Sequence, residues 1–151
     1  ATALARIDLL NKLSQNFDVT VYTHADCKDI LPTAIYGGKI DYYDTMPTIF
    51  QHSKINLNIT LKTIQTGIPL RAWDILGCGG FLLTNFQQEL CHFFIPGEDF
   101  VYYESPADAI EKAAYFLSHD RERQEIAHNA FEKIAASHTF HHRVQSMFDI
   151  I

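Results

Sequence analysis

The sequence lacks the short motifs that identify several common enzyme classes. It contains no G-x-G-x-x-G pattern and no P-loop, which argues against NAD and ATP sites of those types. It also lacks the tight-turn motif that surrounds a serine or cysteine nucleophile. No apolar run reaches the roughly 18 residues of a membrane-spanning helix, and no signal peptide is present. We therefore expect a cytoplasmic protein without a transmembrane segment.

Cysteine and positive charge are both scarce. The cysteines are Cys27, Cys78 and Cys91, an odd number without the spacing of a metal site, which favours reduced thiols. The 12 Lys and Arg residues are outnumbered by 18 Asp and Glu residues, giving a net charge of -6. This balance argues against a nucleic-acid partner and against a polybasic membrane patch. An anionic ligand held by one arginine or by a helix end remains open.

What the sequence does contain is enough apolar material for one core. The 151 residues include 47% hydrophobic and 13% aromatic residues, which excludes a disordered chain and suits a single domain over 1–151. The chain starts almost directly in a helical pattern without an initiator Met. That start suggests a fragment of a longer protein, although removal of the Met would also explain it.

Helical and strand-like patterns alternate along the chain, which predicts a parallel sheet with helices on both faces. The expected strands cover 18–23, 39–43, 53–60, 81–83 and 100–104, with 25–38 as a polar connection. The expected helices cover 3–15, 46–52 with Asp44 as cap, 86–94, 105–117 with Ser105 as cap, 120–137, and 140 to the end.

The stretch from Thr66 to Asn85 is the centre of this pattern. Pro69 suits the first position of a short helix, whose apolar face would be formed by Leu70, Trp73 and Leu76. Gly77 would let this helix approach the sheet closely. Gly79 and Gly80 would end the helix in a left-handed conformation before a buried strand.

Arg71 and Asp74 stand three residues apart on the central helix and have two interpretations. They can form an ordinary ion pair on the helix surface. They can also belong to a ligand site, because a helix N-terminus attracts anions and an arginine binds phosphate with two hydrogen bonds. Their position favours the second interpretation. In open parallel sheets ligands bind outside the carboxyl ends of the strands, which here are Thr23-His24, Thr60 to Lys62, Thr84-Asn85 and Glu104-Ser105.

Four segments together resemble the C-terminal part of GT-B glycosyltransferases, and in particular the spore-maturation CgeB-like proteins. The similarity covers roughly residues 50–147, about two-thirds of the chain. The segments are SKINLNIT, GIPLRAWDILGCGGFLLTN, GEDFVYYESPADAIEKAAYFLSHDRERQEIAHNA and HTFHHRV. The second segment follows the pattern G-x-x-x-R-x-x-E-x-x-x-x-G-G, with Asp74 in the place of the glutamate.

The resemblance implies a Rossmann-like domain with a helical C-terminal tail that binds a nucleotide-sugar donor, with UDP-sugars favoured. It places Asp74 on the donor ribose and the N–H groups near Gly67 and Ile68 on the diphosphate. Arg71, with Lys62, would oppose the charge of the departing nucleotide diphosphate. His24, at a strand end, is a candidate contact to base or phosphate. GT-B enzymes generally need no metal for this step, so no metal or other cofactor is expected.

Two departures from the family pattern limit what is carried over. The acid at position 74 is Asp rather than Glu, and the first acid of the E-x7-E motif would fall on Thr66, which is not acidic. The acceptor and the general base come from an N-terminal domain in this family, so no catalytic residue is assigned here and the isolated chain is expected to be inactive. The alternative is a non-catalytic interaction module that kept the fold and lost the donor site.

Histidines and tyrosines have other interpretations. His138, His141 and His142 cluster near the last expected helix, where packing or capping is favoured over metal binding. The tyrosine pairs Tyr42-Tyr43 and Tyr102-Tyr103 could stack a base, but such pairs in strands are more often divided between core and surface.

Overall fold

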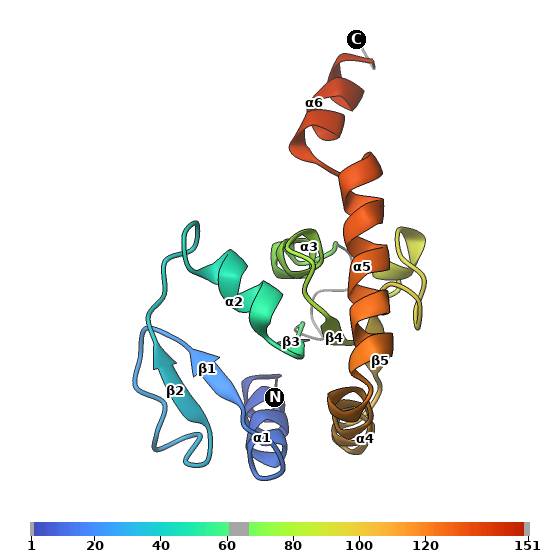
Figure 1. Ribbon diagram of the computed structural model, residues 1–151. Helices are drawn as coiled ribbons and strands as arrows, with labels where there is room; N and C mark the ends of the chain where they lie inside the picture. Colours follow the sequence, from blue (N-terminus) through green and yellow to red (C-terminus); the bar gives the residue numbers. More distant parts are fainter. Residues whose placement is uncertain (1, 61–66, 150–151) are drawn as a thin grey trace.

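The computed structural model of the chain describes residues 2–60 and 67–149 (Figure 1). In chain order the elements are α1 (Thr2–Ser14), β1 (Thr20–Tyr22), β2 (Ile35–Gly38), α2 (Met46–His52), β3 (Asn56–Asn58), α3 (Leu70–Gly77), β4 (Leu82–Asn85), the 3₁₀ helix η1 (Leu90–His92), β5 (Val101–Tyr103), α4 (Pro106–Ser118), α5 (Asp120–Ser137) and α6 (Phe140–Phe148).

All strand pairs of the described residues are parallel. β3, β4 and β5 form a three-stranded sheet in that order, in which Leu57 pairs with Leu83 and Leu83 with Val101. β1 and β2 form a separate two-stranded sheet. Parallel strands joined by helices confirm the predicted Rossmann-like α/β class, with the described strands divided between two sheets.

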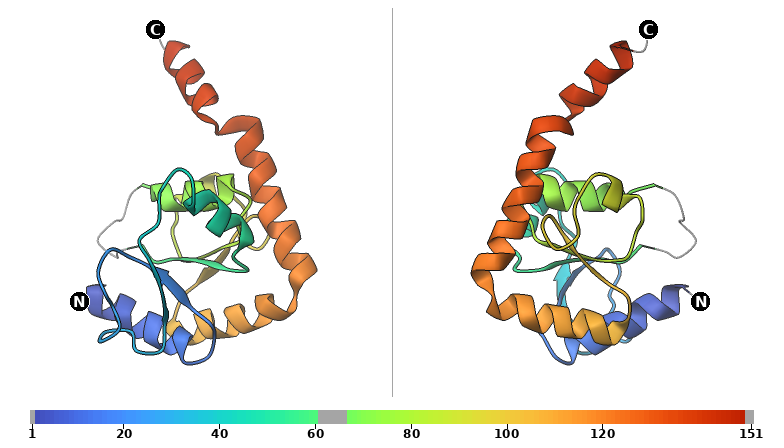
Figure 2. Two further views of the ribbon diagram at one scale, coloured as in Figure 1. Left: turned by 60° about the vertical axis from the view of Figure 1, so that its left-hand side comes forward. Right: turned by 90° about the vertical axis from the view of Figure 1, so that its right-hand side faces the viewer.

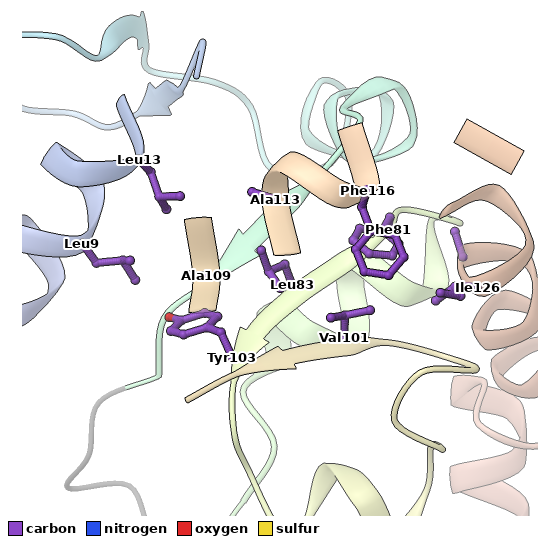
Figure 3. Packing of buried hydrophobic residues seen from close by; sticks show 11 residues of the cluster. Leu9, Leu13, Phe81, Leu83, Val101, Tyr103, Ala109, Ala113, Phe116 and Ile126 are labelled. Atoms are coloured by element: carbon purple, nitrogen blue, oxygen red, sulfur yellow. The ribbon is translucent and has the colours of Figure 1, made fainter. Parts of the chain in front are cut away.

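Helices cover both faces of the three-stranded sheet (Figure 2). On one face lie α1, α4 and part of α5, and the shared cluster includes Leu9, Leu13, Phe81, Leu83, Val101, Tyr103, Ala109, Ala113, Phe116 and Ile126 (Figure 3). On the other face lie α2, α3 and a later turn of α5. The buried cluster on this face consists of Met46, Phe50, Ala72, Ile75, Leu76, Leu82, Leu90, Phe94, Phe100 and Ala130. α5 therefore contributes to both clusters and holds the two layers together.

The last helix, α6, extends away from the sheet (Figures 1 and 2). Its apolar residues Phe140, Val144, Met147 and Phe148 are exposed. Thr139 caps the helix, since its hydroxyl accepts the N–H of His142 while the His142 ring contacts the Thr139 N–H. None of the helices described by the structure is both long and apolar enough to cross a membrane.

The prediction of a strand at 39–43 is wrong, because β2 occupies Ile35–Gly38 and a turn follows it. Gly37 explains the shift: a Cβ there would lie 2.5 Å from the ring of Tyr22 on β1, so only glycine allows this close pairing. The turn is held by Asp41, whose carboxylate accepts the N–H groups of Tyr43 and Asp44 at 2.8 Å.

Two other local predictions are also wrong. Asp44 does not cap α2, because Thr45 takes the cap position and makes no side-chain cap hydrogen bond. The helix expected at 86–94 is reduced to the single turn of η1. There the chain must reverse quickly into β5, and the Asp99 carboxylate accepts the Ile95 N–H at 2.6 Å to fix that reversal. Phe94 is buried, whereas the neighbouring Phe93 is 41% exposed.

The central unit from Gly67 to Asn85 forms as predicted in outline and differs in packing. α3 begins at Leu70 with Pro69 in the cap position, and Leu70 is exposed rather than part of the buried face. The buried face is Ala72, Ile75 and Leu76. A Cβ at Gly77 would meet Ile134 of α5 at 3.9 Å, so this glycine faces α5 and not the sheet.

The Gly79-Gly80 pair has two separate structural roles. Gly79 adopts φ +74°, the left-handed conformation that was predicted to end the helix. Gly80 makes the closest approach in the unit, because a Cβ there would lie 2.7 Å from the Phe50 carbonyl oxygen and from Asn56 Nδ2. The turn between α3 and β4 therefore packs directly against the end of α2 and the start of β3.

Candidate functional site

Asp74 lies in the middle of α3 and is half-buried. Its Oδ2 accepts a hydrogen bond of 2.6 Å from the hydroxyl of Tyr42, a residue 32 positions earlier in the chain. This bond raises the pKa of the Tyr42 phenol, since ionisation would place a second negative charge beside the carboxylate. The structure thus joins Asp74 to the turn that follows β2.

Arg71 does not pair with Asp74, so the ordinary ion-pair interpretation is wrong: in the described part of the chain, no ion pair includes Arg71. Its Nη1 lies 3.2 Å from the Met46 sulfur, and its Cζ lies 5.6 Å from the centre of the Phe50 ring. A thioether is a weak acceptor and a ring carries no net charge. The positive charge of Arg71 therefore has no carboxylate partner among the described residues.

A small hollow lies beside Asp74. Its volume is about 120 Å³, and it is lined by Tyr42, Tyr43, Met46, Pro47, Phe50, Asp74 and Cys78. Burial, together with the charge of Asp74, raises the pKa of the Cys78 thiol, so this cysteine stays protonated and is a poor nucleophile. The lining residues give the hollow an apolar, partly aromatic wall, with the carboxylate of Asp74 at its side.

The loop before α3 has an unexpected partner. Gly67, with φ +96°, donates its backbone N–H to the carboxylate of Glu89. Sequence reasoning missed Glu89, which lies 22 residues away without any recognisable motif around it. An acid thus holds the N–H group at which the resemblance places the donor diphosphate. Ile68, the neighbouring expected contact, is half-buried.

The carboxyl ends of β3 and β4 meet in a buried polar network. Asn58 donates from Nδ2 to the hydroxyls of Thr60 and Thr84, each at 3.0 Å. The N–H of Thr60 donates to Asn85 Oδ1 at 2.7 Å. The predicted meeting of Thr60 with Thr84 and Asn85 is confirmed. Asn58, which lies within the strand expected at 53–60, is buried and central here.

The other expected site residues do not join this group. His24 follows β1, in the two-stranded sheet, and is exposed. Among the described residues, no hydrogen bond or ion pair joins it to Arg71 or Asp74. The backbone N–H of Glu104 bonds to Asp108 at 2.9 Å, and the Ser105 hydroxyl caps α4 by accepting the Asp108 N–H. Lys62 and Thr66 lie outside the described residues.

Two histidines of the tail cluster have the structural roles that were predicted: His138 packs and His142 caps a helix. The ring of His138 lies 5.4 Å from Trp73 and 5.5 Å from Phe93, in a group of aromatic rings. His142 contributes to the cap of α6. Throughout residues 2–60 and 67–149, no group of three or more His, Cys, Asp or Glu side chains is arranged to hold a metal ion.

The family of glycosyl transferase-like proteins matches residues 6–149, which is nearly the whole chain. The chain therefore belongs to this family. No curated protein matches the sequence significantly.

Proposed function

We propose that this chain is the donor-binding part of a GT-B glycosyltransferase of the CgeB-like group. It holds a nucleotide-diphosphate sugar, with a UDP-sugar favoured, in a cytoplasmic enzyme. The acceptor and the general base come from an N-terminal domain outside the present residues. Membership of the glycosyl transferase-like family supports glycosyl transfer as the reaction, and the local geometry supports the donor end of it.

The observation that carries the proposal is the environment of Asp74. Its carboxylate already accepts a short hydrogen bond from an O–H donor at the side of an apolar hollow. A ribose hydroxyl is the same kind of donor, and acids bind ribose in this way in dinucleotide-binding folds. The ring of Phe50 and the side chain of Pro47 supply apolar surface next to that carboxylate for the rest of a nucleoside.

Arg71 supplies the charge that a diphosphate needs. It is the second residue of α3, at the positive end of the helix dipole. No ion pair of the described residues neutralises it, so its guanidinium is available to an anion. In the reaction it would oppose the negative charge that develops on the departing nucleotide diphosphate. This arginine and the helix N–H groups would take the part that a metal ion plays in other transferases, so the proposal includes no metal.

Titration calorimetry with UDP, GDP, ADP and CMP tests the proposal, together with NMR mapping of the residues that shift. We expect UDP to bind with high micromolar to millimolar affinity and to shift signals between Gly67 and Gly80. Asp74→Ala should weaken binding about tenfold or more, because it removes a charged hydrogen-bond acceptor. Arg71→Ala should weaken it by about fivefold to tenfold. Glu111→Ala and Arg121→Ala, which change exposed charges on α4 and α5, are the matched controls.

If Asp74→Ala and Arg71→Ala both keep the wild-type affinity, the site assignment is wrong. The contact between Glu89 and Gly67 favours the second candidate, an interaction module without a donor site, because an acid there repels phosphate. The two functions separate in the full-length protein. Nucleotide binding there supports the transferase, and its complete absence at millimolar concentration supports the module.

A further inference from the structure

Tyr42 occupies the oxygen of Asp74 that the proposed function assigns to a ligand. The bond from its phenol to Asp74 Oδ2 is 2.6 Å long. From the sequence, Tyr42 is a possible base-stacking residue and not a partner of Asp74. In the structure, its hydroxyl donates to the Asp74 carboxylate. A phenol and a ribose hydroxyl are both neutral O–H donors, so they can compete for the same position beside this carboxylate.

We propose that Tyr42 is an exchangeable latch on Asp74, displaced when a ribose hydroxyl takes its hydrogen bond. The inference rests on the proposed nucleotide-binding function and adds the residue that sets its affinity. Tyr42 holds Asp74 in the ligand-free protein, so that a half-buried carboxylate keeps a hydrogen-bond donor. The nucleotide then competes with the protein's own side chain for the same atom.

The surroundings of Tyr42 allow the exchange. The side chain is 44% exposed and lies in the turn after β2, outside the two hydrophobic clusters. The turn itself is held by the Asp41 carboxylate through backbone N–H groups. Rotation of the Tyr42 ring therefore gives up its bond to Asp74 and an edge contact to Tyr43, with ring centres 5.2 Å apart, while the turn keeps its own hydrogen bonds.

The size of the hollow supports the same conclusion. Its volume of about 120 Å³ is below the roughly 300–1,000 Å³ of most small-molecule sites. Tyr42 forms one wall of the hollow, so its departure enlarges the space and releases Asp74 in a single movement. We expect a nucleoside that enters the hollow beside Asp74 to displace this side chain.

The apparent affinity for the nucleotide is the intrinsic affinity multiplied by the fraction of molecules in which Tyr42 is not bonded to Asp74. If the phenol is bound to Asp74 in nine molecules of ten, removal of its hydroxyl strengthens binding about tenfold. The experiment measures UDP binding to the chain and to the full-length protein, each as wild type and as Tyr42→Phe. We expect Tyr42→Phe to bind UDP about threefold to tenfold more tightly.

Tyr115 provides a matched control. It is also 44% exposed, and its phenol donates to the Glu122 carboxylate at 2.8 Å. This bond raises the pKa of Tyr115, as the bond to Asp74 raises that of Tyr42. Tyr115→Phe removes the same kind of bond between α4 and α5, away from the hollow, and should leave UDP affinity unchanged.

A second measurement follows the latch directly. In protein labelled with ¹³C at the tyrosine Cζ, NMR titration reports each phenol separately. Saturating UDP should lower the pKa of Tyr42 toward its ordinary value, because the phenol has left Asp74, and should leave that of Tyr115 raised. Asp74→Asn should lower the pKa of Tyr42 without any ligand.

The outcomes are distinct. Tighter binding of UDP by Tyr42→Phe, with no change in Tyr115→Phe, supports the latch. Equal or weaker binding by Tyr42→Phe, in a protein whose wild type binds UDP, overturns the latch and leaves the proposed function standing. If neither the wild type nor Tyr42→Phe binds UDP, GDP, ADP or CMP at millimolar concentration in the full-length protein, the proposed function is wrong and the latch fails with it.

Discussion

The two sheets that the structure describes are built from strands of similar length and differ greatly in burial. In the three-stranded sheet, Leu82 and Leu83 of β4 are 0% and 1% exposed, because helices cover both faces. In the two-stranded sheet, Ile35 and Tyr36 of β2 are 50% and 38% exposed. Burial of apolar surface is the main source of folding free energy, so stability is concentrated in the three-stranded region.

The candidate site lies where these two regions meet. Asp74 comes from α3, whose buried face packs against the three-stranded sheet, and Tyr42 comes from the exposed turn after β2. The well-packed region fixes the position of the carboxylate. The sparsely packed region supplies the side chain that must move, and that side chain lies outside the two hydrophobic clusters. The difference in burial therefore gives the site one fixed side, which carries Asp74, and one side that can move, which carries Tyr42.

The sharpest test of the difference compares one aromatic residue from each region. Phe100, directly before β5, is 0% exposed, and Phe100→Ala should lower the free energy of unfolding by about 4 kcal/mol through a large cavity. Tyr36→Ala, in β2, should cost less than about 1 kcal/mol, because the ring is already partly in water. Urea unfolding measures both. Equal losses would show that the two sheets are equally important for stability.

A second test concerns the close contact between α2, β3 and the turn after α3. Gly80→Ala should destabilise the protein by about 3 kcal/mol, since its Cβ would press on the Phe50 carbonyl oxygen at 2.7 Å and the backbone must shift. Gly77→Ala is the matched control: its Cβ has 3.9 Å to Ile134, so the change should be neutral or stabilising by up to about 1 kcal/mol. A harmless Gly80→Ala would contradict the described packing.

The smallest expected effect appears at alkaline pH. Tyr103 lies in the hydrophobic cluster drawn in Figure 3. Burial raises its pKa to about 12, and its hydroxyl has no hydrogen-bond partner in the part of the chain that the structure describes. Below pH 10 both folded and unfolded chains keep this phenol neutral, whereas above it the unfolded chain ionises first. Stability should therefore fall by about 2 kcal/mol as pH rises from 10 to 12.

Tyr103→Phe should remove that alkaline loss and be neutral or slightly stabilising at pH 7, where it deletes a buried hydroxyl without a described partner. Tyr36→Phe, in the exposed sheet, should follow the wild-type pH profile. Urea unfolding at several pH values measures the difference. A Tyr103→Phe profile that matches the wild type would mean that water reaches this hydroxyl in the folded protein.

Sequence periodicity predicted most of the three-stranded region, because its elements are fixed by local signals. Ser105 and Pro106 mark the start of α4, and the apolar run 81–83 gives a strand buried on both faces. The two-stranded region was predicted less well. β2 was misplaced because its position depends on Gly37 fitting against the ring of Tyr22, a contact between distant residues that no local pattern encodes.

The candidate site shows the same limit. Asp74 and Arg71 could be selected from the sequence because helix spacing and the helix dipole act within a few residues. The long-range partners of Asp74 and of the loop before α3 could not. Tyr42 reaches Asp74 across 32 residues, and Glu89 reaches Gly67 across 22. Neither pair has a spacing that a periodic pattern could reveal.

The sequence by itself determined the α/β class, the central helix and its two charged residues, and the resemblance to glycosyltransferases. Those features follow from backbone propensity, apolar periodicity and motif spacing, which are properties of short segments. Only the tertiary structure decided that Arg71 lies over Phe50 rather than beside Asp74, and that the Tyr42 hydroxyl donates a hydrogen bond to the Asp74 carboxylate. Such contacts arise when separate elements pack together, and the geometry of that packing is set by the whole core.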